Sequence, residues 1–491
     1  MALANVIDTS KSLDKTRELH GRRVIRSSVG EITEDNVVFV LENALYEHEM
    51  NRAEIQYLWD YYRGKQPVLN REKEIRPDIC NKIVENRANE IVSFKVGYLC
   101  GEPIQYIGRR GDDEVTAAIM ELNELMFAED KAAKDREIVE WQMICGTAFR
   151  MILPDEPSEE DEAPFEIYTL DPRETFIVYS TEIGEKPLMA VKYAKDTDTQ
   201  VTTYSVYTEN RYYLIEDGRI EDVRPHALDS IPIIEYPANN ARLGAFEIVL
   251  PLLDSINNVE SNRMDGIEQF IQAYWKFIGC NIDKEKYQEF LKEGAILVPP
   301  NDNGGRIDVD LIVKELNQDQ TQTLKEDFYN SILTICGMPN RNGGSSTSDT
   351  GAAVLLRDGW SLAEARAKDS ELMFKKSEKA MLKLVLRICR DLLKDFDLKL
   401  KDIDMKFTRR NYEAIQSKSQ VLISMLQQPK IHPILAFEHS GLFTDPESAY
   451  ALSMKYYDEQ MEKWNPKEVD EDDENVSGDG QVHEETEKEN P

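Results

Sequence analysis

The residues best suited to chemistry lie in one small polar stretch, residues 340–351, which reads Asn-Arg-Asn-Gly-Gly-Ser-Ser-Thr-Ser-Asp-Thr-Gly. A glycine-rich loop before a helix can bind phosphate, because its backbone amides and the helix dipole face the anion. Here no Gly-Lys-Ser/Thr follows, and a helical pattern rather than a strand precedes, so the features of a nucleotide site are missing. The composition predicts a solvated loop, either a surface linker or a loop that projects into a space through which something else passes.

Three other clusters could hold a metal ion, and each lacks part of a site. His432 and His439 flank an apolar run without a third ligand. The order Asn-Asp-Asn-Gly at residues 301–304 resembles a calcium loop, but the glycine register differs and no glutamate occupies the twelfth position. Asp78 and residues 129–131 could suggest a metal-dependent nuclease, although the second group lies in a helical, alanine-rich stretch. No Gly-x-Ser-x-Gly motif occurs, and we predict no catalytic residue, no metal, no cofactor and no enzyme.

The composition limits the kind of protein. A chain of 491 residues with 41% hydrophobic residues is expected to fold as two to four domains with sizeable cores. No apolar stretch approaches the ~18 residues of a membrane span, and residues 1–12 lack signal-peptide features, so we expect an intracellular protein without membrane contact. The six cysteines are scattered without a CxxC pair, which favours reduced thiols over disulfides or zinc.

The charge is strongly acidic, at −33. Residues 467–491 hold eleven acids and two bases, so −9 of this charge lies in the C-terminal tail and −24 in the rest. Such a composition predicts a disordered tail. The acidic balance argues against a sequence-independent DNA clamp, because the affinity of such clamps comes from Lys and Arg side chains that displace counterions.

Two helical patterns must position the polar loop. The first, residues 321–336, ends at Gly337, and Pro339 prevents its continuation. The second, residues 352–395, would be about 66 Å long at 1.5 Å per residue. We expect one interruption at Gly359, because Ser-Leu-Ala-Glu follows as a capping box that could restart the helix at a new angle. Gly359 is therefore a predicted hinge.

The remaining patterns predict an α+β protein. Helical spacing occurs at residues 36–62, 79–98, 113–127, 131–145, 246–278, 412–426 and 446–464. Strands are predicted at residues 146–152, 165–170, 175–179, 188–193, 201–207, 212–215, 294–300, 306–316 and 404–408. Residues 1–34 are polar and charged, and we expect them to form a flexible arm.

A set of short motifs along the chain resembles a known family. They are KVGYLCGEPI at 95–104, GTA at 146–148, LDPR at 170–173, IPIIEY at 231–236, LLDSIN at 252–257, SN at 261–262, GMP at 337–339 and TGAA at 350–353. Their order and spacing over residues 61–464 resemble portal proteins, the head-to-tail connectors of tailed double-stranded-DNA bacteriophages, of the type in long-tailed phages of Gram-positive bacteria. One departure is Thr350-Gly351-Ala352, where the family pattern has Ser-Gly-x-Ala.

The resemblance implies a mainly helical, ring-forming portal fold, usually of twelve subunits around an axial channel. Its parts would be a flexible arm at 1–34, a wing at 35–245 that is β-rich at 165–237, stem helices at 246–278 and 318–337, a clip at 279–317, a tunnel loop at 338–351, a long kinked helix returning to the wing at 352–411, a crown at 412–464 and a disordered acidic tail at 465–491.

The resemblance also implies a role in the virion, at the portal vertex of the capsid, after assembly in the host cytoplasm. DNA would pass non-specifically through the ring, and the partners would be the terminase, head-to-tail adaptor proteins, scaffolding protein and major capsid protein. The loop residues expected to line the channel are Asn340, Arg341, Asn342, Ser345, Ser346, Thr347, Ser348, Asp349 and Thr350.

Arg341 is the only base between Cys336 and Leu356, so we expect it to meet passing phosphates. Pairing with Asp349 or with a neighbouring subunit is an equally open alternative. Two other classes of protein also stay open at this point: a ring-forming or scaffold-like structural protein without DNA passage, and an enzyme such as a nuclease.

Overall fold

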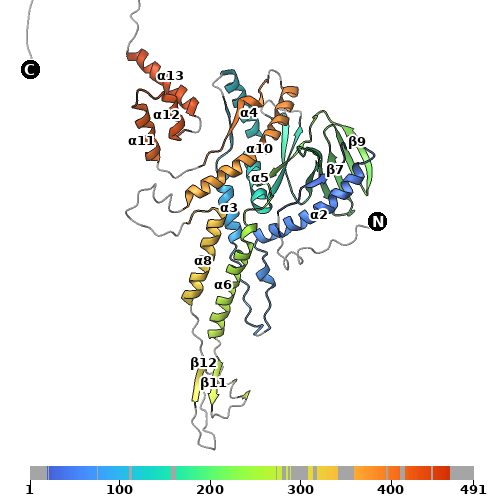
Figure 1. Ribbon diagram of the computed structural model, residues 1–491, viewed down its shortest axis with the longest axis vertical. Helices are drawn as coiled ribbons and strands as arrows, with labels where there is room; N and C mark the ends of the chain where they lie inside the picture. The colour runs from blue at the N-terminus through green and yellow to red at the C-terminus, as the bar shows by residue number, and fades with distance from the viewer. Residues whose placement is uncertain are drawn as a thin grey trace, which may run out of the picture. The chain divides into compact units, whose positions relative to one another are not determined.

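The computed structural model describes two compact units, Met1–Glu413 and Ala414–Pro491, which we treat separately (Figure 1). The described residues are 19, 21–74, 76–109, 113–155, 162–271, 274–278, 284–285, 288, 308–312, 318–340, 359–393, 396–409, 415–443 and 446–464. Helices and sheets alternate in the first unit, which confirms the predicted α+β class. None of the described helices combines the length and the hydrophobicity that crossing a membrane requires.

The two largest sheets among the described residues lie in the first unit. One has six strands in the order β1-β5-β6-β7-β8-β9, and the other has three in the order β10-β3-β4. Their bounds are β1 Ile25–Ser27, β3 Thr147–Pro154, β4 Phe165–Leu170, β5 Thr175–Ser180, β6 Pro187–Lys195, β7 Thr202–Tyr207, β8 Arg211–Glu216, β9 Arg219–Pro225 and β10 Ile233–Pro237. All pairings are antiparallel except β1 with β5. The alternating patterns read from the sequence are confirmed, while β1, β9 and β10 were not predicted as separate strands.

Helices cover these sheets and join them to the rest of the unit. Helix α2 (Val37–Tyr62) packs its Val37, Val40 and Leu41 side chains on the six-stranded sheet (Figure 1). The other helices of this part are η1 Pro67–Asn70, α3 Arg87–Leu99, α4 Asp113–Ala128, α5 Lys131–Cys145 and η3 Leu400–Asp402, with a two-stranded pair of β2 Gln105–Gly108 and β13 Ile403–Lys406. The predicted helices 36–62, 113–127 and 131–145 are confirmed.

The expectation of a flexible arm over residues 1–34 is wrong for the part that the structure describes. Arg22 is 4% exposed, and its guanidinium pairs with Glu54 at 2.9 Å and Glu247 at 3.0 Å. Ile25 is buried in β1, which pairs with β5. The polar composition alone predicted a flexible arm, because the partners that bury Arg22 lie far along the chain and leave no local pattern. Residues 1–18 and 20 lie outside the described part.

The helix predicted at 79–98 begins only at Arg87, because the preceding residues run extended along helix α6 (Leu250–Ile271). The backbone amides of Asn81, Ile83 and Glu85 donate to side-chain oxygens of α6 at 2.7, 3.0 and 2.8 Å. The acceptors are Asp265, Ser261 and Asn257. Every second residue of the extended segment donates, and every fourth residue of α6 accepts. Two extended residues rise about 6.6 Å and four helical residues about 6 Å, so successive donors stay aligned with successive acceptors.

The long helix predicted at 246–278 is wrong at both ends. A 3₁₀ turn, η2 (Glu247–Val249), precedes α6, and the chain beyond Ile271 forms strand β11 (Tyr274–Ile278). The run Tyr-Trp-Lys-Phe-Ile of β11 is rich in aromatic residues, which favour strands. Strand β11 pairs with β12 (Asp308–Ile312), which lies within the predicted strand 306–316. The predicted strand 294–300 lies outside the described residues.

Helix α8 (Gln318–Cys336) packs beside α6 (Figure 1). Polar contacts support this pair, since Lys325 lies 2.7 Å from the carboxylate of Glu260 and Arg263 donates to Gln322 at 3.0 Å. Lys325 also pairs with Glu85 of the extended segment at 2.9 Å. The first helical pattern, predicted at 321–336, is therefore confirmed together with its end at Cys336.

Four charged side chains form a buried ion network at the centre of the first unit. Lys131 and Asp135 come from α5, Arg150 from β3, and Glu378 from helix α10 (Trp360–Leu392), and none is more than 3% exposed. Lys131 lies 2.7 Å from both Asp135 and Glu378, and Arg150 lies 2.7 Å from Asp135 and 3.4 Å from Glu378. Burial raises the pKa of Glu378, but the two cations outweigh it and set this pKa at about 2.

Two tyrosines complete the network. Tyr106 of β2 and Tyr236 of β10 donate to the Glu378 carboxylate at 2.5 and 2.6 Å. Burial and the nearby carboxylate raise the pKa of both tyrosines, so they stay protonated and act as donors. The network thus joins five elements that are distant in sequence.

The described part of the second unit contains three helices, α11 (Ile415–Leu426), α12 (Pro433–Ser440) and α13 (Pro446–Trp464). Its buried centre includes Phe437, which stacks with Phe443 at 5.1 Å and meets Tyr450 edge-on at 5.7 Å. The first and third helices are close to the predictions, whereas the eight-residue α12 was missed. His432 caps α12, because its ring accepts a hydrogen bond from the Ile434 amide at 3.3 Å.

Removing one charge from the buried ion network should destabilise the first unit. Glu378→Gln leaves two buried cations with one carboxylate, and we expect a loss of about 3–5 kcal/mol in the free energy of unfolding. Urea unfolding followed by tryptophan fluorescence measures it. Glu182→Gln, at an exposed position, is the matched control and should change stability by less than about 0.5 kcal/mol. Equal effects of the two substitutions would contradict the role of the network.

Candidate functional site

The structure describes the chain on the two sides of the predicted channel loop, at residues 337–340 and at Gly359, and we call these two places the loop roots. Asn340 is described, and its side-chain amide donates to Asn330 at 3.1 Å. The other predicted channel residues lie outside the described part of the chain: Arg341, Asn342, Ser345, Ser346, Thr347, Ser348, Asp349 and Thr350. Their contact with DNA stays a prediction.

The two roots of this segment lie side by side. After α8, Gly337 turns the chain with a φ of 66°, and Met338 and Pro339 follow. Gly359, at the start of α10, has a φ of 84°, and a Cβ built on it would lie 3.7 Å from the Met338 carbonyl oxygen and from the Pro339 Cα. The described residues on the two sides of positions 341–358, Met338 and Pro339 on one side and Gly359 on the other, therefore lie close together.

The predicted hinge, Gly359, is the residue at which α10 begins. It occupies the N-cap position in the left-handed region, without a side-chain cap, and the helix starts at Trp360. The part of the predicted helix before it, residues 352–358, lies outside the described residues. A change of helix direction at Gly359 therefore stays a prediction.

Contacts from α3 fix the first root. The Lys95 ammonium donates to the Cys336 carbonyl at 2.8 Å, which satisfies one of the unpaired carbonyls at the C-terminus of α8. Burial lowers the pKa of Lys95. Sequence reasoning assigned no role to Lys95, although it lies in the KVGYLCGEPI motif.

Contacts from α3 and the chain after η3 fix the second root. Glu364, near the start of α10, accepts from the Tyr98 hydroxyl at 2.9 Å and from Arg409 at 2.9 Å. Burial raises the pKa of Glu364, but these partners lower it below its usual value. Trp360 packs 6.2 Å from Phe94 and 6.0 Å from Tyr98, measured between ring centroids. Aromatic and ionic contacts thus hold both roots on one rigid base.

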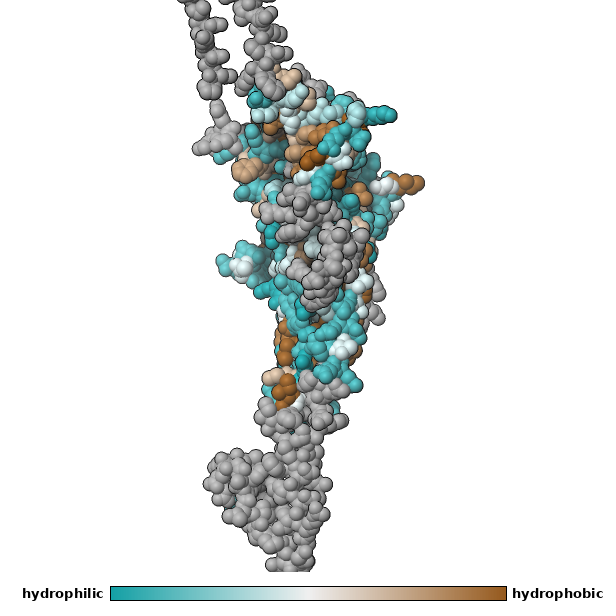
Figure 2. Space-filling model, turned by 90° about the vertical axis from the view of Figure 1, so that its left-hand side faces the viewer, coloured by the Kyte–Doolittle hydropathy of each residue, from teal (hydrophilic) through white to brown (hydrophobic). Residues whose placement is uncertain are grey.

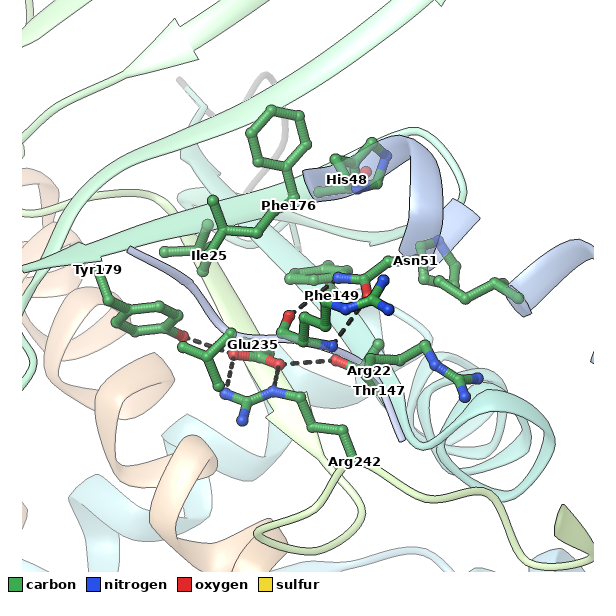
Figure 3. Close-up of a pocket in the computed structure, with 16 residues that line it drawn as sticks. Arg22, Ile25, His48, Asn51, Thr147, Phe149, Phe176, Tyr179, Glu235 and Arg242 are labelled. Carbon is green, nitrogen blue, oxygen red and sulfur yellow. Dashed lines mark hydrogen bonds and ion pairs between the residues drawn. The ribbon is translucent and has the colours of Figure 1, made fainter. Parts of the chain in front are cut away.

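A second candidate site is a small cavity beside β1, α2 and β5, of about 30 Å³, which is room for about two water molecules (Figure 3). Its polar wall is built around Glu235, which accepts from Tyr179 at 2.6 Å, Thr147 at 2.9 Å and Arg242 at 2.6 and 2.9 Å. Burial raises the pKa of Glu235, and Arg242 lowers it below its usual value. These four hydrogen bonds satisfy the Glu235 carboxylate.

No group of three or more metal-binding side chains exists within the described residues. His432 caps a helix, and Lys131 of the 129–131 group is part of the buried ion network. Asp78 pairs with Arg76 at 2.8 Å on the surface. These positions have structural partners in place of the metal-site roles considered from the sequence.

The sequence matches the family "Phage portal protein, SPP1 Gp6-like" over residues 41–474. The match covers most of the chain, and we conclude that the chain belongs to the phage portal proteins. Within that class it belongs to the SPP1 Gp6-like family. The resemblance to portal proteins stated from the sequence is confirmed, and the type of phage stays a prediction.

No curated protein sequence matches the chain. Among solved structures, a chain from the "neck of empty GTA particle computed with C6 symmetry" is similar over 72% of this chain and 90% of its own length. The identity is 11% and the TM-score 0.42. A chain from the "neck of native GTA particle computed with C12 symmetry" covers 72% and 89%, at 11% identity and a TM-score of 0.41. Because both TM-scores are below 0.5, the assignment of the chain to the portal proteins rests on the family match alone.

The glycines at the two roots should respond differently to an added methyl group. Both have left-handed backbones, which cost an L residue about 1–2 kcal/mol. At Gly337 the new Cβ would also lie 2.8 Å from the Arg366 Cγ, whereas Gly359 has space. We expect Gly337→Ala to lower the free energy of unfolding by about 1 kcal/mol or more beyond Gly359→Ala.

The control for this pair is Gly97→Ala, inside α3, where a new Cβ meets no atom within 4 Å. Alanine is the better helix former there, and we expect a gain of about 0.5–1 kcal/mol. Urea unfolding of all three variants makes the comparison. If Gly337→Ala proves no worse than Gly359→Ala, the tight contact with Arg366 is unimportant.

His48, which lines the cavity of Figure 3, should make stability depend on pH. Its ring stacks on Phe176 at 4.5 Å, and burial lowers its pKa to about 4. The unfolded chain binds this proton below pH ~6.5 and the folded chain only near pH 4, so stability is lost as the pH falls through this window. Between pH 7.5 and 5 we expect a loss of about 2 kcal/mol from His48.

His48→Phe removes this titration. The difference in free energy of unfolding between pH 7.5 and 5 should therefore shrink by about 2 kcal/mol in the variant. Urea unfolding at both pH values, on both proteins, measures the effect. An unchanged difference would show that His48 does not carry the pH dependence.

Proposed function

We propose that this chain forms the portal ring at one capsid vertex, with twelve copies around an axial channel through which double-stranded DNA enters during packaging and leaves during ejection. The observation that carries the proposal is the family match over residues 41–474. The terminase docks on the ring first, and head-completion and tail adaptor proteins replace it. The ring assembles in the host cytoplasm with scaffolding and major capsid proteins. The role is structural, and the proposal includes no catalytic step.

The parts of the ring follow the family resemblance. Helices α6 and α8 are the stem, residues 279–317 the clip, and residues 338–351 the tunnel loop. The wing spans 35–245, and the crown spans 412–464. The adjacent roots at Gly337 and Gly359 support a loop that extends from one fixed base.

Exposed hydrophobic side chains on the helix pair support association between copies. Figure 2 shows hydrophobic patches among hydrophilic ones on one side of the molecule. On α6, Met264 is 38% and Ile267 39% exposed, and on α8, Leu324 is 45% and Ile335 42% exposed. Water contact with these hydrophobic side chains is unfavourable, and packing against a neighbouring copy would remove it.

The acidic charge favours DNA that slides through the ring over DNA that is bound tightly by it. A chain at −33 withholds the counterion-release contribution that would make DNA adhere to it. Repulsion reaches only a Debye length, about 8–10 Å at physiological salt, and so acts where the wall is close. Uncharged Asn, Ser and Thr residues of the predicted loop can touch the DNA backbone weakly.

Native mass spectrometry with negative-stain microscopy tests the proposal. Rings of about twelve copies with a central hole are expected. A protein that stays monomeric even with scaffolding protein present would contradict the portal ring, and would favour the alternative of another structural protein without DNA passage.

Arg341 is the residue by which we test DNA contact in the channel. Arg341→Ala removes the single cation of residues 337–355, and we expect packaging efficiency or packaged DNA length to fall several-fold. Arg341→Lys keeps the charge and is the matched control, expected to stay near wild type. Particles that package normally with Arg341→Ala would exclude a phosphate contact and leave pairing with Asp349 or a neighbouring subunit.

A further inference from the structure

The second half of α10 carries five cations on one face. They are Lys376, Lys379, Lys383, Arg387 and Arg390, at spacings of three and four residues, and we name them the cationic stripe. All are exposed except Arg387, which is partly exposed. The stripe covers fourteen steps of 1.5 Å, or about 21 Å of helix. No acid occurs on this face between the first and last cation, because Glu378 points into the buried ion network.

The opposite face of the same helix segment is fixed in the core. Its buried residues are Phe374, Met381, Leu382, Leu384, Val385, Leu386, Ile388 and Cys389. Helix α10 also contacts strands β3, β4 and β10 (Figure 1). A straight, firmly held helix therefore presents the stripe, so the cations keep a fixed spacing.

The stripe is unusual in an acidic protein. Acids outnumber Lys and Arg residues by 92 to 59, and several cations elsewhere in the first unit, such as Arg22, Lys325 and Arg409, are held in ion pairs. Within the described residues, the lysines of the stripe form no ion pair. Arg387 donates to the Leu228 carbonyl and lies 3.9 Å from Asp229, which leaves most of the positive charge uncompensated.

We propose that the cationic stripe binds the sugar-phosphate backbone of double-stranded DNA outside the channel. This inference rests on the proposed function, which supplies the polyanion. A duplex strand has one phosphate per 3.4 Å of helix axis, so about six phosphates span the ~21 Å stripe. Lys and Arg contact phosphates without reading sequence, and the remaining acidic surface repels DNA. The contact is therefore weak, local and sensitive to salt.

Closed circular duplex DNA is the probe that separates this surface from the channel, because a closed circle cannot thread a preformed ring. Binding of the assembled protein to a closed plasmid is measured by sedimentation at 50, 100 and 200 mM salt. The test variant is K376Q/K379Q/K383Q. We expect its association constant at 50 mM to be at least tenfold below wild type, and the slope of log K against log salt to fall by about 0.9 for each lysine.

The matched control is K186Q/K195Q/R219Q, which removes the same charge from exposed positions at the ends of β6 and β9. We expect less than a threefold change. Equal losses in both triple variants would overturn the proposal, because net charge alone would explain them. Absence of wild-type binding to the circle at 50 mM would also overturn it.

Two further readouts assign the stripe to another partner. In the first readout, polyglutamate and free duplex DNA compete with the plasmid for the protein. If polyglutamate displaces the plasmid as effectively per charge as free duplex does, the stripe binds an acidic polypeptide and the proposal of a DNA site is overturned. Loss of assembly in K376Q/K379Q/K383Q, seen by native mass spectrometry while circular dichroism shows a folded chain, would assign the stripe to contacts between copies and also overturn it. If K376Q/K379Q/K383Q forms intact rings and binds the plasmid as the wild type does, only the DNA-binding role of the stripe is refuted. If the wild type forms no rings, the proposed function is refuted.

Discussion

The buried ion network of Lys131, Asp135, Arg150 and Glu378 is the interaction on which the arrangement of the first unit depends. Two cations and two anions balance, so no net charge is buried. Such a network gives little net stability, because desolvation opposes the Coulomb attraction, but it penalises strongly any arrangement that separates the partners. Since Glu378 lies near the middle of α10, the network fixes the helix whose first turn forms a loop root and whose second half carries the cationic stripe.

Polar contacts between distant segments recur through the unit. Arg22 joins the N-terminal strand to α2 and η2, and the α6 side chains Asn257, Ser261 and Asp265 hold an extended segment by its backbone amides. One hydrophobic cluster includes residues of α2, α3, α5, α6, α8 and α10. Met338, at the first loop root, therefore belongs to the same core as helices α6 and α8.

The distribution of charge supports the proposed passage of DNA through the ring. Buried and half-buried cations of the first unit, including Arg150 and Arg409, are neutralised by carboxylates, while the surface is dominated by acids. The lysines of the cationic stripe, in contrast, form no ion pair within the described residues. Weak, separated contacts allow a polyanion to move, because each contact breaks at small cost.

The sequence by itself determined the features that depend on local spacing: α2, α4, α5 and α8, the alternating strands, the turn at Gly337 and the family. Only the tertiary structure decided the features whose partners are distant. Arg22 is buried because Glu54 and Glu247 meet it, and residues 80–86 stay extended because α6 accepts their amide hydrogens. The apolar spacing of residues 274–278 fits helix and strand alike, and pairing with β12 selects the strand. The spacing of apolar residues predicts which face of a helix or strand is buried, whereas the segment that covers this face is decided by tertiary packing.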